Sequence, residues 1–165
     1  MSKIGMIVIG FFICSIAYIY IWEIPQTIKK GKENKIRASL IKKEQKIIEK
    51  NSIKIAKVLN IECGDCPDTD KLLIGSSLLN RVDSKEFPNT LDGVIYQPNQ
   101  YKISKNYTEH DKKLAVCLLE NYFRDCDVLY FYNPKSATDK DFLSKMRKRN
   151  LIVQTKHHIY KWNTN

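Results

Sequence analysis

The pattern of apolar and polar positions begins with one long apolar segment. Ile4–Trp22 contains 19 residues and no charge, which at about 1.5 Å per helical residue is enough to cross a bilayer core of roughly 30 Å. The apolar core of a cleaved signal peptide is shorter, and no small-residue cleavage site precedes Pro25. The segment therefore predicts a transmembrane helix, and we assign residues 1–24 to a membrane anchor.

The next segment is predicted to be one helical stalk. From Lys35 to Ile61 the apolar residues recur at helical spacing, with lysines and glutamates between them. We assign residues 25–50 to this stalk. A break at Asn51-Ser52, with Ser52 as the N-cap of a shorter helix, then starts a folded domain over residues 51–165.

Three further helices are predicted in the domain, over residues 69–82, 108–122 and 136–148. Thr108 and Thr138 are each followed within three residues by an acidic side chain, which is typical of an N-cap and the first turn of a helix.

The remaining periodicity predicts a small sheet. Residues 128–132 have the β-branched and aromatic content of a strand, and residues 151–153 and 158–161 form a hairpin that could pair with it. Residues 93–97 are expected to be extended or short-helical, followed by a turn at 97–100. The predicted fold class is α+β, mainly helical with a small antiparallel sheet.

The net charge of +10 is concentrated after the apolar segment, where residues 25–51 hold nine basic and three acidic residues. A positive flank is typical of the cytoplasmic side of a membrane. The same residues could bind anionic lipid headgroups or wall polymers, or form a solvated helix face. No nucleic-acid-binding motif is present in the sequence, so nucleic acid is not expected as a partner.

Glu62 is the carboxylate with the most informative context, because it follows the apolar residues Val58, Leu59 and Ile61. An apolar site raises the pKa of a carboxyl group, which can then serve as a general acid. Candidates for a second carboxylate follow in the next turn and at the predicted start of a helix, where aspartate is also common for structural reasons. These candidates are Asp65, Asp68 and Asp70.

Four cysteines lie outside the apolar segment: Cys63, Cys66, Cys117 and Cys126. In an exported domain they would form two disulfides, with three possible pairings. Cys63 and Cys66 have the spacing of zinc ligands, but Cys117 and Cys126 do not form a second close pair. No metal and no cofactor are therefore expected.

Several stretches, in this order, resemble the SleB/CwlJ-type cell-wall hydrolase family, and together they cover most of residues 52–162. They are VLNIE at 58–62, LNRV at 79–82, FPNT at 87–90, GVIYQP at 93–98, YFYNP at 130–134 and HIY at 158–160. The resemblance implies a lysozyme-like fold with a glutamate, here Glu62, at the end of a helix facing a sugar groove. The family typically continues with Ala, Arg, Gly and Glu, whereas this chain continues with Cys63, Gly64, Asp65 and Cys66.

The resemblance also implies the reaction and its substrate, the glycan strands of peptidoglycan. In a lytic transglycosylase the same glutamate acts first as acid and then as base toward the 6-hydroxyl of the sugar, which yields a 1,6-anhydro product. Amide, hydroxyl and aromatic groups at the matching positions are expected to bind the sugars. These are Gln100, Tyr101, Tyr130, Tyr132 and Asn133.

A wall substrate requires the domain to face the wall, with the membrane contacted through residues 4–22. The charge pattern instead favours the cytoplasmic side. An exported phage lysis enzyme would reconcile the wall substrate with the charge pattern. The alternative function is a membrane-tethered cationic module that binds wall polymer or nucleic acid without catalysis, through the stalk and the basic cluster at 145–149. A wall-binding module that keeps the fold and has lost catalysis is a third reading.

Overall fold

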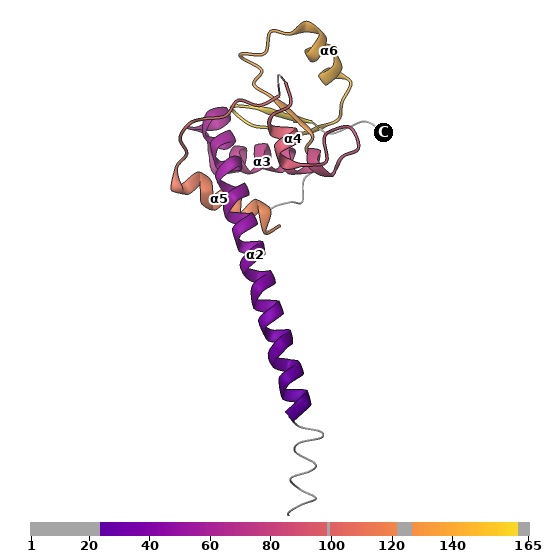
Figure 1. The fold of residues 1–165 in the computed structure, drawn as a ribbon. Coiled ribbons are helices and arrows are strands. Elements are labelled where there is room, and N and C mark those ends of the chain that lie inside the picture. Colours follow the sequence, from indigo (N-terminus) through magenta and orange to yellow (C-terminus); the bar gives the residue numbers. More distant parts are fainter. Residues whose placement is uncertain (1–23, 99, 122–126, 162–165) are drawn as a thin grey trace, which may run out of the picture. The chain divides into compact units, whose positions relative to one another are not determined.

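The computed structural model describes residues 24–98, 100–121 and 127–161 (Figure 1). The predicted transmembrane segment Ile4–Trp22 lies outside these ranges. Among the helices within them, none combines the length and apolar character that a bilayer crossing requires.

Contacts divide the chain into two units, residues 1–46 and 47–165. Helix α2, Ile24–Cys63, is continuous through the predicted boundary, so the break expected at Asn51-Ser52 is wrong. The Ser52 hydroxyl donates to the carbonyl oxygen of Glu49 one turn earlier, at 2.9 Å. A serine that satisfies its side chain in this way remains compatible with a helix interior.

Within its described residues, the second unit has four more helices: α3 (Asp68–Asp83), α4 (Leu91–Ile95), α5 (Glu109–Leu119) and α6 (Lys140–Arg147). The predicted helices at 69–82, 108–122 and 136–148 are thereby confirmed, with ends that differ by a few residues. Thr108 is the N-cap of α5 and forms a capping box with Asp111, as the sequence predicts. Helix α6 is capped by Asp139 instead of Thr138, because the Asp139 carboxylate accepts two backbone N–H groups.

The sheet has three short antiparallel strands in the order β1-β3-β2: β1 is Tyr130–Tyr132, β2 is Leu151–Gln154 and β3 is Ile159–Lys161. Phe131 is paired with Tyr160 across β1 and β3. The predicted hairpin and its pairing with the earlier strand are confirmed. The central strand β3 pairs with both β1 and β2.

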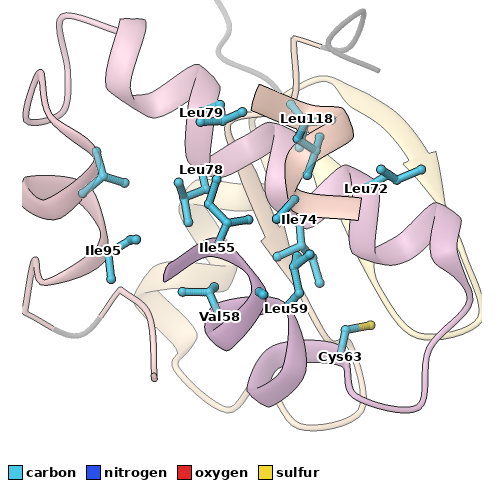
Figure 2. Close-up of a cluster of buried hydrophobic side chains, with 14 of the residues drawn as sticks. Ile55, Val58, Leu59, Cys63, Leu72, Ile74, Leu78, Leu79, Ile95 and Leu118 are labelled. Carbon is cyan, nitrogen blue, oxygen red and sulfur yellow. The ribbon is translucent and has the colours of Figure 1, made fainter. Parts of the chain in front are cut away.

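The core forms where the end of α2 meets α3, α4 and α5 (Figure 2). Ile55, Val58 and Leu59 of α2 are fully buried there, as are residues from the other three helices. A Cβ added to Gly75 of α3 would lie 2.2 Å from Leu118 Cδ1 of α5. The glycine therefore permits the close packing of these two helices.

A buried ion pair also joins α3 to α5. Lys71 Nζ lies 2.7 Å from Asp111 Oδ1, with the side chains 7% and 0% exposed. Burial by itself would raise the pKa of Asp111, but hydrogen bonds from Lys71 and Thr108 hold it below its ordinary value. Asn60 of α2 donates to the same carboxylate at 3.3 Å, so one charged group connects three helices.

Candidate active site

A cavity of about 350 Å³ lies at the end of α2, bordered by residues from α3, the turn before Tyr101, β1, α6 and the turn between β2 and β3. It is lined by Glu62, Arg81, Gln100, Phe131, Tyr132, Asn133, Ser136, Phe142 and His158. The structure thus brings four of the predicted site residues together around one cavity: Glu62, Gln100, Tyr132 and Asn133.

Glu62 reaches the cavity from the last turn of α2. The preceding residues Val58 and Leu59 are buried in the core, which fixes the helix and leaves Glu62 half-buried at its edge. One carboxylate oxygen, Oε1, accepts a hydrogen bond from the backbone N–H of Lys102 at 3.1 Å. This bond orients the carboxyl group without engaging another charged side chain.

Arg81 is a wall residue that the sequence analysis did not assign to the site. Its side chain is only 5% exposed, and Nε donates to the Leu129 carbonyl at 2.8 Å while Nη1 donates to Gln100 Oε1 at 3.0 Å. The guanidinium group also lies over the rings of Phe87, Tyr101 and Tyr130. An arginine on the apolar side of a predicted helix is unusual. This placement is the feature of the sequence that could have identified Arg81 as a site residue.

Tyr101 packs against Arg81 and is not among the residues that line the cavity. Its hydroxyl is 3.3 Å from Ser77 Oγ. Burial raises the pKa of Tyr101, opposed by the charge of Arg81 and reinforced more weakly by the charge of Glu62. Its ring lies 5.0 Å from the Arg81 guanidinium, so Tyr101 contacts the cavity lining through Arg81.

Tyr130 and Tyr132 have different surroundings, although both belong to β1. Tyr132 lies in the cavity wall beside Phe142, with ring centroids 5.8 Å apart. Tyr130 lies outside the lining, where its hydroxyl donates to Glu86 at 2.9 Å and its ring packs under Arg149. Burial and the Glu86 carboxylate raise the pKa of Tyr130. Phe131, which lies between these two tyrosines in the sequence, also lines the cavity.

None of the three aspartates considered as a second carboxylate lines the cavity. Asp65 is exposed in the turn after α2, and Asp68 pairs with His110 at 2.7 Å. Asp70 is buried, and it accepts hydrogen bonds from Thr155 and Tyr160 at 2.7 Å each. Among the described residues of the cavity wall, Glu62 is therefore the single carboxylate.

The turn that follows Glu62 is closed by a disulfide between Cys63 and Cys66, one of the pairings that the sequence left open. Among the described residues, Cys117 has no disulfide partner and is exposed, and Cys126 lies outside them. Cys63 Sγ is also 3.8 Å from His158 Nδ1. The disulfide and His158 therefore meet directly beside Glu62.

A family model described as Cell Wall Hydrolase matches residues 66–161, beginning four residues after Glu62. A spore cortex-lytic enzyme of Bacillus cereus is 31% identical over 80 residues, which are 45% of this chain and 31% of that protein. The match thus spans about a third of the relative's length.

Two solved structures resemble this chain. The catalytic domain of the Bacillus cereus SleB protein aligns with a TM-score of 0.58 and 28% identity, covering 68% of this chain and 90% of that domain. The catalytic domain of the germination-specific lytic transglycosylase SleB of Bacillus anthracis aligns with the same TM-score and identity, covering 67% and 93%.

Proposed function

The chain belongs to the cell wall hydrolase family, and from this we propose that it cleaves the glycan strands of peptidoglycan as a lytic transglycosylase. The observation that carries the proposal is that Glu62 is the single carboxylate among the described residues that line the cavity. Water-driven glycoside hydrolysis ordinarily uses two carboxylates on opposite sides of the bond. A transglycosylase uses one, because the nucleophile is a hydroxyl group of the substrate itself.

In this reaction Glu62 first donates its proton to the glycosidic oxygen, and the bond between that oxygen and the anomeric carbon breaks. The resulting carboxylate then accepts the proton of the sugar's 6-hydroxyl as O6 bonds to the anomeric carbon. Glu62 ends protonated, ready for the next cycle. The Lys102 N–H, held 3.1 Å from Oε1, keeps the carboxyl group in one orientation through both transfers.

We assign sugar binding to the polar and aromatic groups of the same wall. Gln100 and Asn133 offer amide groups, and Tyr132 offers a ring face and a hydroxyl. Arg81 positions Gln100 by donating to its side-chain oxygen, and the Arg81 guanidinium itself packs against the rings of Tyr101 and Tyr130. The arrangement is consistent with a lysozyme-like groove that ends at a helix-terminal glutamate.

The chemical form of the released wall fragments distinguishes a lytic transglycosylase from a hydrolase and from a binding module. Purified peptidoglycan is digested with the full chain in detergent, and the released muropeptides are identified by mass spectrometry. We expect anhydro-ended fragments, each lighter by one water than the corresponding reducing-end fragment. Reducing-end products would instead indicate hydrolysis, and binding to intact wall without release of fragments would favour the binding-module function.

We also propose that residues 4–22 anchor the chain and that the second unit lies on the wall side. This follows from the uncharged apolar segment and from the location of the substrate. Cys117 is exposed, so a membrane-impermeant maleimide should label it in spheroplasts before lysis. A Cys117→Ser variant gives the background from the other cysteines. Labelling of Cys117 only after lysis would place the domain in the cytoplasm.

A further inference from the structure

Three metal-binding side chains converge beside the Glu62 cavity. Cys63, Cys66 and His158 each offer one ligand atom, and these atoms all lie within 4.8 Å of one another. Two come from the end of α2 and the turn after it, and the third comes from the turn between β2 and β3, 95 residues from Cys63. The cluster is therefore a product of the tertiary structure.

The two sulfur atoms are joined in a disulfide, and a thiolate is the form of cysteine that binds metals. We propose that the reduced chain binds one thiophilic divalent cation, such as Zn²⁺, through Cys63, Cys66 and His158. Reduction and metal binding are then linked, because the disulfide takes up two electrons and two protons to give two thiols. Binding of the cation releases those two protons.

The distances suit a tetrahedral site. Zinc binds thiolate sulfur at about 2.3 Å and imidazole nitrogen at about 2.0–2.1 Å, which separates two such ligands by roughly 3.5 Å. Cys63 Sγ and His158 Nδ1 are 3.8 Å apart. Cys66 is half-buried, so its sulfur can rotate away from Cys63 once the disulfide is open. The turn persists, because the Cys66 N–H also donates to the Cys63 carbonyl at 3.2 Å.

The charge balance of the site also favours the cation. Cys63 is 3% exposed and His158 is 5% exposed, so an unpaired thiolate there would be costly. Two thiolates and one divalent cation together carry no net charge. A Cys₂His set leaves a fourth position for water, since no further histidine, cysteine or carboxylate joins the cluster within the described residues.

A buried carboxylate lies beside the same histidine nitrogen. Asp70 Oδ1 lies 3.4 Å from His158 Nδ1 and is itself fixed by hydroxyl groups of Thr155 and Tyr160. The cation would replace the proton on Nδ1, so the Asp70 carboxylate would face the cation as a neighbouring negative charge. His158 also lines the Glu62 cavity, so binding of the cation would alter that part of the cavity lining.

The test is a cobalt titration of the full chain in detergent, with Cys14, Cys117 and Cys126 replaced by serine so that two of the five cysteines remain. A phosphine reductant opens the disulfide: it takes the oxygen of one water, whose two protons complete the thiols. We expect one Co²⁺ per reduced chain, with thiolate-to-cobalt charge-transfer bands that Zn²⁺ abolishes. The oxidised protein should show no bands.

Ligand variants identify the side chains. Cys66→Ser and His158→Asn, in the same background, should each weaken Co²⁺ binding by more than about tenfold. The proposal is overturned if the reduced protein, with two free thiols by titration and a folded circular dichroism spectrum, shows no thiolate bands in excess Co²⁺. Unchanged affinity in folded His158→Asn would also overturn it. If that variant does not fold, Cys66→Ser and the comparison of oxidised with reduced protein still decide.

Discussion

Glu62→Gln is expected to lower the rate of peptidoglycan cleavage by about 10²- to 10⁴-fold. Glutamine cannot donate the proton that the leaving oxygen needs, and it cannot later accept the proton of the 6-hydroxyl. Its side-chain oxygen can still accept the Lys102 N–H, so the local structure should persist. The loss belongs to the chemical step, and the binding of wall material should change little.

The measurement is the initial rate of muropeptide release, with wall binding by co-sedimentation as the second readout. Glu120→Gln is the matched control, because this glutamate is exposed at the end of α5 and away from the cavity wall. It should keep the wild-type rate. A folded Glu62→Gln protein with a wild-type rate would remove Glu62 from the mechanism and, with it, the single-carboxylate proposal.

Asp111→Asn is expected to destabilise the second unit by about 3–5 kcal/mol, the usual cost of leaving one partner of a buried ion pair alone. Lys71 would then be charged and almost completely buried without its carboxylate. Asparagine still offers an oxygen to the backbone N–H and hydroxyl of Thr108. The loss should therefore come from the charge and only slightly from the helix cap.

The free energy of unfolding is measured by urea denaturation of the full chain. Glu109→Gln, an exposed change in the first turn of the same helix, should cost less than about 0.5 kcal/mol. Adding Lys71→Met to Asp111→Asn should restore part of the stability, because it removes the unpaired charge. If the double variant is as unstable as the sum of the two single variants, the ion pair is not the source of the effect.

The same pair determines a response to acid. The pKa of Asp111 is lower in the folded protein than its ordinary value, so its contribution to stability is complete above the unfolded-state pKa of about 4. The contribution is lost as the pH falls from there through the folded-state pKa. The Asp111→Asn variant should lose less stability over this pH range than the wild type does.

Local order in this chain was largely determined by the sequence alone. Periodicity and capping chemistry act over one or two helical turns, and they sufficed for α3, α5 with its Thr108 cap, and the hairpin of β2 and β3. The position of Glu62 at the end of a helix was implied by the family resemblance, and the structure places it in the last turn of α2, after the buried residues Val58 and Leu59. The error at Ser52 arose because a serine can cap a helix or donate to a carbonyl within one, and both are local options.

Only the tertiary structure decided which side chains share a surface. Tyr130 and Tyr132 have the same strand periodicity, yet the loop containing Glu86 and Phe87 covers one and leaves the other in the cavity wall. His158 meets Cys63 across 95 residues of sequence. Such long-range contacts depend on how the helices and the sheet pack together, and the whole core determines this packing. Sequence patterns report only the neighbours of each residue along the chain.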